Sequence, residues 1–257
     1  MRSHSTPTAA LLASLVLVSC GPAPDNNKAP AAAPAATPAS SVPSRRDILR
    51  TERKQYSQHD EEVIIRDFFQ DSRGGFFVDV GCAWPKKDSN TYYLEAELGW
   101  SGIGIDALPE YAQPWSNKRR NSKFFNFAVT DHSGSFETFY RSELPGISAL
   151  EPRKVFGGRE VKSKGFQVPT ITLTKLLDDN GITKVDLLSM DIELAEPLAL
   201  AGFDIDRFKP RLACVEVHGQ VEKQIVGYFA SHGYERIERY REYDGVNYYF
   251  APKAAGR

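Results

Sequence analysis

Four side chains that could move protons follow two short apolar runs in the second half of the chain. Asp191 and Glu193 come after the first run, and Glu216 and His218 end the second. If the runs are neighbouring strands, about 5 Å apart, the four groups converge. Glu216 and His218 then share a face, because strand side chains alternate. Such a cluster could hold a general base for a hydroxyl group, or carboxylates and an imidazole could bind a divalent ion.

Two of the acids in this region have a structural alternative. Asp191 could cap the helix that follows its strand. Glu196, at the start of that helix, could stabilise the helix dipole. We do not expect a metal, and its candidate ligands would be Asp191, Glu216 and His218.

A second candidate site lies around a glycine and an acid in the first half of the chain. The apolar run Phe76–Val80 ends at Gly81, which lets the backbone approach a ligand without an intervening Cβ. Asp106 follows a second apolar run and can accept hydrogen bonds from both ribose hydroxyls. Gly81 is followed by Cys-Ala-Trp-Pro, so there is no G-x-G-x-x-G motif for a pyrophosphate. These residues favour a cofactor with a ribose and no phosphate, such as S-adenosylmethionine (SAM).

Alternating strands and helices must position both sets of residues. Residues 76–80 are typical of a strand buried on both faces, and residues 90–100 predict a helix that Gly99 ends. The run that ends at Asp106 completes a βαβ unit, which binds nucleosides at the carboxyl ends of its strands. A plain βαβ unit with solvated acids is the alternative.

The remaining globular part continues this alternation and predicts a three-layer α/β sandwich with seven strands. We expect further helices over residues 45–71, 109–121, 172–180, 195–202 and 221–232. We expect the other strands of the sheet over residues 123–129, 185–190, 212–217, 234–240 and 246–251, and an antiparallel continuation of 123–129 over residues 136–140. The irregular segment 144–166 is a candidate lid or acceptor-recognition loop. The basic clusters 118–120 and 153–164 are expected to be solvated.

A family resemblance connects these pieces. The stretch FVDVGCAWPKKDSNTYYLEAELGWSGIGIDALPEY, which starts at Phe77, resembles the opening of the FkbM-type methyltransferases. In that family an Asp-x-Gly-x-x-x-Pro turn precedes Ser-Asn-Thr and a Gly-Trp-x-Gly approach to the second strand. The resemblance continues through residues 147–150, 168–173 and 187–193, ends near 215–218, and covers roughly residues 60–220.

This resemblance implies SAM-dependent methyl transfer, often to hydroxyl oxygens. It also implies a Rossmann-like methyltransferase fold, with a mostly parallel seven-stranded sheet in the order 3-2-1-4-5-7-6 and helices on both faces. The cofactor contacts that it implies are Asp79, Gly81, Asn90, Thr91, Asp106 and Ala128. The catalytic candidates are Asp191, Glu193, Glu216 and His218.

Some residues depart from the family pattern. Leu194 stands where family members usually carry glycine, and Pro197 falls in the first turn of a helix, a position that tolerates proline. Trp84 either packs over the cofactor or covers the sheet. These departures keep a second function open, in which a membrane-anchored, catalytically altered module binds a glycan or small molecule.

The acceptor is predicted from the acid-rich second site. A nucleophile that must lose a proton fits such a site, so a hydroxyl is favoured over an already basic amine. We therefore expect O-methylation of a sugar or glycan hydroxyl. The formal net charge of −1 argues against nucleic acid as the main partner, because phosphate binding needs a basic surplus. Nothing in the sequence predicts an oligomeric state.

The first forty-four residues are predicted to lie outside the globular domain 45–257. Residues 9–18 are an apolar run too short to cross a membrane, and residues 1–20 are typical of a signal peptide. The ending Leu-Val-Ser-Cys resembles a bacterial lipobox, which implies acylation of Cys20 and an extracytoplasmic, membrane-anchored protein. An ordinary cleaved signal is the alternative, and the protein is cytoplasmic if the signal is not used. Residues 21–44, rich in Ala and Pro, predict a disordered tether.

Two further cysteines lie in the predicted domain. Cys82 and Cys214 belong to strands that a third strand separates, so their Cα atoms should be about 9–10 Å apart. A disulfide needs less than about 7 Å, so we expect free thiols.

Overall fold

The computed structural model describes residues 45–143, 148–152, 155–156 and 159–254. The predicted signal peptide, the acylation site Cys20 and the tether 21–44 lie outside these residues. In the described part of the chain, no helix has the length and apolar character needed to cross a membrane.

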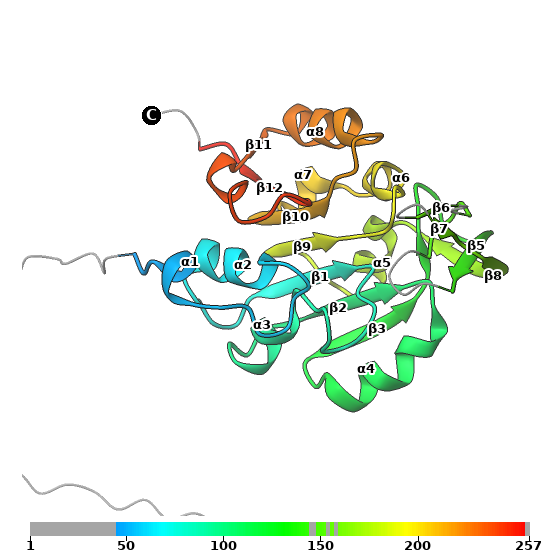
Figure 1. Cartoon of the computed structure of the whole chain (residues 1–257), viewed down its shortest axis with the longest axis horizontal. Helices are drawn as coiled ribbons and strands as arrows, with labels where there is room; N and C mark the ends of the chain where they lie inside the picture. The colour runs from blue at the N-terminus through cyan, green and yellow to red at the C-terminus, as the bar shows by residue number, and fades with distance from the viewer. Residues whose placement is uncertain (1–44, 144–147, 153–154, 157–158, 255–257) are drawn as a thin grey trace, which may run out of the picture. The chain divides into compact units, whose positions relative to one another are not determined.

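A seven-stranded sheet forms the centre of the domain, in the order β11-β12-β10-β9-β1-β2-β3 (Figure 1). Neighbouring strands are parallel except at β12, which is antiparallel to both β10 and β11. The strands are β1 (Phe76–Val80), β2 (Ser101–Asp106), β3 (Ser122–Asn126), β9 (Leu187–Met190), β10 (Leu212–Glu216), β11 (Tyr234–Arg236) and β12 (Asn247–Pro252). Counting only these seven along the chain gives 3-2-1-4-5-7-6, which confirms the predicted fold.

Helices cover both faces of this sheet because residues of the central strands are apolar on both sides. On β1, Val78 and Val80 pack into a core with one set of helices, and Phe77 packs into a second core with the other. The first set is α5 (Leu173–Asp179), α6 (Glu196–Ala201), α7 (Ile205–Phe208) and α8 (Glu222–Ser231). The second includes α2 (Glu61–Phe69) and α3 (Tyr92–Ala96), with α1 (Ile48–Thr51) against α2. Another helix on that side is α4 (Ala112–Lys118), whose Trp115 lies against Gly104 of β2.

A small second sheet extends the chain beyond β3, in the order β4-β8-β5. Its strands are β4 (Ala128–Val129), β5 (Phe136–Ser142) and β8 (Ser163–Ile171). A short pair, β6 (Val155–Phe156) and β7 (Arg159–Glu160), lies between β5 and β8 in the chain. The 3-10 turns are η1 (Pro109–Tyr111) and η2 (Glu238–Tyr240).

Three element predictions need correction. The helix predicted over 45–71 is two helices, because the Glu62 carboxylate accepts the backbone N–H groups of Gln55 and Tyr56 and folds the intervening segment back. The segment 144–166 is not one irregular loop, since β8 begins at Ser163 and pairs with β5. The strand predicted over 234–240 ends at Arg236, and a 3-10 turn follows.

The cysteine prediction is confirmed for the described residues. Cys82 and Cys214 are both free and buried. They contribute apolar surface to the core and take no part in a disulfide.

Candidate functional site

A pocket of about 410 Å³ lies at the carboxyl ends of the central strands. The chain leaves β1 towards β2 and β3, and later returns to β9 on the opposite side of β1. Ligands of open α/β sheets bind at such a switch point. One end of the pocket, here called the cofactor end after the role predicted for it, is lined by Gly81, Asp106, Ala107, Leu108 and Ala128. The other, the acid end, is lined by Asp191, Glu193, Glu216 and His218.

Gly81 joins the two ends of the pocket. Its backbone N–H donates to the carbonyl of Ile105 (2.9 Å), and its φ of +80° belongs to the region that favours glycine. A Cβ at this position would lie 1.8 Å from the carbonyl oxygen of Asp191. Glycine is therefore required where the turn after β1 passes the end of β9, in addition to its predicted role towards a ligand.

Asp106 lies at the tip of β2 with both oxygens facing backbone donors. Oδ2 accepts the N–H of Ala83 (3.0 Å), and Oδ1 accepts the N–H of Leu108 (2.8 Å). Burial raises the pKa of Asp106 to about 7. Each carboxylate oxygen has a further lone pair, so the oriented group can also accept two hydroxyl donors, as predicted for a ribose.

Asp79, Asn90 and Thr91, three predicted cofactor contacts, are not among the residues that line the pocket. Thr91 donates its hydroxyl to Asp79 (2.6 Å), and Asn90 donates to the hydroxyl of Ser189 (3.1 Å). Burial raises the pKa of Asp79. In this geometry the three residues hold the segment after β1 against the sheet, and their contact with a cofactor stays a prediction.

A buried arginine completes that support. Arg119 donates to Thr91 (2.9 Å) and pairs with Glu95 (3.0 Å), and its side chain is fully buried. The prediction that residues 118–120 form a solvated face is wrong for Arg119. No sequence pattern distinguished it from its two basic neighbours, because the partners come from a helix and a loop far along the chain.

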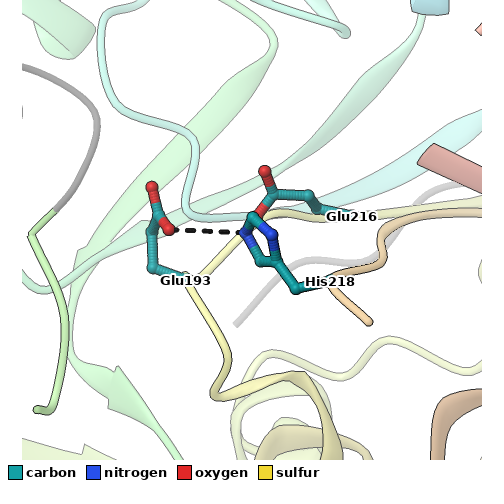
Figure 2. Close-up of side chains that lie close together, drawn as sticks. All are labelled: Glu193, Glu216 and His218. Carbon is teal, nitrogen blue, oxygen red and sulfur yellow. Dashed lines mark ion pairs between the residues drawn. The ribbon is translucent and has the colours of Figure 1, made fainter. Parts of the chain in front are cut away.

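At the acid end, one nitrogen of His218 faces two carboxylates. Nε2 lies 3.0 Å from Oε2 of Glu216 and 3.6 Å from Oε2 of Glu193. Figure 2 shows Glu193 reaching the imidazole from the loop after β9, while Glu216 and His218 come from the end of β10. The carboxylate side chains are only 9% and 12% exposed, and the imidazole is 31% exposed. The structure thus brings together three of the four predicted catalytic residues in direct contact.

Asp191 is the fourth member of the acid end and faces the pocket. Asp191 is exposed to the pocket, and partial desolvation there, together with the neighbouring Glu216 carboxylate, raises its pKa. The N-cap of α6 is Ala195, so Asp191 does not cap that helix, which was its structural alternative. Its backbone N–H instead donates to the carbonyl of Val80 (2.9 Å).

The loop between β9 and α6 has an unusual backbone. Glu193 and Leu194 have φ values of +57° and +77°, a region that costs most L-residues about 1–2 kcal/mol. Leu194 therefore has a backbone conformation that favours glycine, at the position where the family pattern usually has glycine. Below the loop, fully buried Glu196 accepts the N–H of Ile192 (3.0 Å), and burial raises its pKa to about 7. Glu196 therefore binds the loop backbone as well as standing at the start of α6.

Aromatic and apolar side chains form the mouth of the pocket. Trp84 is 44% exposed, and its ring stands edge-on to Tyr111, with centroids 5.0 Å apart. Ser148 and Leu150 also line the pocket, so part of the predicted acceptor-recognition segment reaches it. Tyr111 and Phe139 were missed in the sequence, because an aromatic residue in a helix or strand is usually part of the core.

The arrangement can therefore bind a hydroxylated ligand at one end and remove a proton at the other. Asp106 offers oriented acceptors beside the apolar Ala107, Leu108 and Ala128. The acid end offers carboxylates and an imidazole within reach of the same cavity.

A comparison with protein families finds one match for this chain. Residues 78–236 match the family described as "Methyltransferase FkbM domain". Among curated proteins none matches the chain. A TehB-like SAM-dependent methyltransferase from Corynebacterium glutamicum is similar in structure, with 15% identity, a TM-score of 0.43 and coverage of 77% of this chain and 89% of that one.

Two further structures are similar at the same level. One is the precorrin-6y C5,15-methyltransferase of Geobacter metallireducens, with 10% identity, a TM-score of 0.40, and coverage of 68% and 70% of the two chains. The other is a 1,6-didemethyltoxoflavin-N1-methyltransferase of Burkholderia thailandensis with bound S-adenosylhomocysteine, with 12% identity, a TM-score of 0.35, and coverage of 74% of each chain.

Proposed function

The chain belongs to the FkbM methyltransferase family, and from this premise we propose that it methylates a hydroxyl oxygen of a sugar or glycan, using SAM. The observation that carries the proposal is the acid end of the pocket. Two carboxylates contact one imidazole, and a third carboxylate, Asp191, faces the cavity. A hydroxyl acceptor must lose its proton, and these groups are the ones positioned to receive it.

The cofactor end fits SAM without a phosphate site. Asp106 has both oxygens oriented by backbone N–H groups and free lone pairs for two ribose hydroxyls. Ala107, Leu108 and Ala128 provide a small apolar surface for a base, and Gly81 keeps side chains away from the turn. When bound, SAM supplies an electrophilic methyl group. The other steps belong to the protein: it orients the acceptor and takes up the proton.

We assign the uptake of that proton to Asp191. It lies at the tip of β9, faces the pocket, and is held by its backbone contact with β1. Glu216 lies beside Asp191 and also contacts His218. A ring acceptor would contact the half-exposed Trp84 through its apolar face and the carboxylates through its hydroxyls.

The test is methyl transfer from labelled SAM to a panel of sugars, glycolipids, small phenols and peptides. We expect label on sugar hydroxyls, and loss of at least about a hundredfold in kcat for Asp191→Asn, the scale of general-base removal. Asp131→Asn is the control, because Asp131 is exposed and pairs only with His132 among the described ion pairs. Label on peptide amines alone would contradict the proposal.

The alternative function is a module that binds its ligand without catalysing. The observation that favours this alternative is the backbone of Leu194, which has a conformation that favours glycine. Calorimetry separates the two functions. Binding of S-adenosylhomocysteine together with turnover supports the enzyme, whereas sugar binding without transfer to any member of the panel supports the module.

We also propose that acylated Cys20 anchors the protein in a membrane on the extracytoplasmic side. The support is the sequence Leu-Val-Ser-Cys after a short apolar run, followed by an Ala/Pro-rich segment. Cys20→Ser should move the protein from the membrane fraction to the soluble fraction in cell fractionation. A wild-type chain that is wholly in the soluble fraction would exclude the anchor.

A further inference from the structure

We propose that Glu193, Glu216 and His218 bind one divalent cation of the first transition series at the acid end of the pocket. The inference deepens the proposed function, because such a cation would hold the acceptor hydroxyl and lower its pKa. Only the suggested role rests on that function. The binding itself is argued from this cluster alone.

The ligand atoms already have the spacing that one ion requires. Oε2 of Glu216 and Oε2 of Glu193 lie 3.0 Å and 3.6 Å from Nε2 of His218, and the three residues offer ligand atoms within 4.8 Å of one another. Metal bonds to carboxylate oxygen and imidazole nitrogen are about 2.0–2.2 Å long, so adjacent ligand atoms are about 3.0–3.5 Å apart. Small side-chain rotations would be enough to admit the ion.

A second cluster of one histidine and two acids differs from the Glu193, Glu216 and His218 cluster in its geometry. His132 also lies near two carboxylates, Asp131 at 2.8 Å and Glu137 at 3.7 Å. There the acids face different ring nitrogens, Nδ1 and Nε2, so the imidazole bridges them and no single ion can contact all three. At the acid end both carboxylates converge on one nitrogen, Nε2 of His218.

Burial and access also differ between the two clusters. The side chains around His132 are 44–47% exposed and lie outside the pocket. Glu193 and Glu216 are 9% and 12% exposed, yet both line the pocket together with His218. Carboxylates that leave water are usually paired or bound to a metal. Three protein ligands leave further coordination positions for oxygens that enter from the cavity.

The ligand types decide which cation to use as a probe. Ca²⁺ and Mg²⁺ prefer oxygen ligands alone, and thiolate ligands are not present in this cluster. One imidazole with two carboxylates suits Mn²⁺, Fe²⁺ or Zn²⁺. Mn²⁺ is the practical choice, because it is stable in air at neutral pH and its free form is measured by electron paramagnetic resonance.

The experiment is calorimetric titration of the metal-free, full-length chain with MnCl₂, in the absence of SAM and acceptor. We expect one saturable site for the wild type and a loss of affinity of at least about tenfold in Glu193→Gln, Glu216→Gln and His218→Gln. His132→Gln is the matched control and should bind as the wild type does. No saturable binding by the wild type, or equal binding by all three variants, would overturn the inference.

Two further measurements distinguish loss of metal binding from misfolding. Each variant is first shown to unfold in a single thermal transition, so that a misfolded variant is not read as a lost ligand. Mn²⁺ should raise the melting temperature of the wild type and of His132→Gln, but not that of Glu193→Gln. Because neither SAM nor acceptor is present, metal binding without methyl transfer to sugars would contradict the proposed acceptor and leave the cation site standing.

Discussion

The two ends of the pocket use carboxylates in opposite ways. At the cofactor end, Asp106 is surrounded by backbone donors, one N–H for each oxygen. At the acid end, Glu193 and Glu216 contact the same imidazole nitrogen, and Asp191 lies against Glu216. The first arrangement orients a single acid between the backbone N–H groups of two chain segments, at Ala83 and Leu108. The second brings like charges together, which costs free energy unless a proton or another ligand is shared.

This difference suggests that the two ends of the pocket have different roles. An acid fixed by two backbone donors is suited to holding a cofactor in a constant position. Acids that compete for one proton or one ion are suited to changing their state during a reaction. The strained backbone at Glu193 and Leu194 lies at the second end, where strain is commonly found in functional sites.

The largest expected effect is a loss of stability at Gly81, where the two ends of the pocket meet. Gly81→Ala should lower the free energy of unfolding by about 3 kcal/mol or more, because the new Cβ would lie 1.8 Å from the carbonyl of Asp191. Gly134→Ala is the matched control. Gly134 has φ +85° but nothing within 4 Å of the added Cβ, so only the backbone cost of about 1 kcal/mol applies. Urea unfolding measures the free energy of unfolding of both variants. An equal decrease in the two variants would mean that Gly81 does not lie against the carbonyl of Asp191.

Removal of the oriented acid tests the cofactor end. Asp106→Ala should weaken binding of S-adenosylhomocysteine by about 1.5–3 kcal/mol, or roughly 10- to 150-fold, the scale for hydrogen bonds to a charged group. Asp179→Ala is a suitable control, because this exposed acid pairs with Lys175 and does not line the pocket. Calorimetry gives the affinities. If Asp191→Asn weakened cofactor binding as much as Asp106→Ala, the division between the ends would fail.

The pH dependence of cofactor binding should come from the same acid. Burial raises the pKa of Asp106 from 3.8 to about 7, so the side chain is protonated below that pH and loses acceptor capacity. Affinity for a ligand that binds the ionised form should therefore fall about 25-fold between pH 7.5 and 5.5 and be nearly constant above about pH 8. The stability that the protonated form contributes is complete below its ordinary pKa of 3.8 and is lost as the pH rises through about 7. Asp106→Asn should abolish the pH dependence of binding, and an unchanged profile would point to another group.

The smallest expected effect is a gain in stability at the acid end. Leu194→Gly should relieve the cost of φ +77° and raise the free energy of unfolding by about 1 kcal/mol, after the entropy that glycine loses is subtracted. For a domain of this size the melting temperature should rise by about 2–4 °C. Leu194→Ala keeps the strained backbone and should show no gain. A gain in both variants would trace the effect to the leucine side chain.

The sequence by itself determined the fold class and the strand order by way of the family resemblance. Apolar runs identified the central strands, since burial on both faces requires them, and Gly81 and Asp106 were placed at strand ends by local pattern. Local pattern also predicted which residues lie at the acid end. Asp191, Glu193, Glu216 and His218 all follow strands that turned out to be neighbours.

Only the tertiary structure decided which of these groups meet. Contact between Glu193 and His218 depends on a positive-φ loop after β9, which no propensity predicts for leucine. The burial of Arg119, and the withdrawal of Asp79 and Thr91 from the pocket, depend on partners 12–28 residues apart in the chain. Residue type and spacing predict which side chains lie at the end of a strand. Distances between side chains from different elements are set by packing, which those local patterns do not contain.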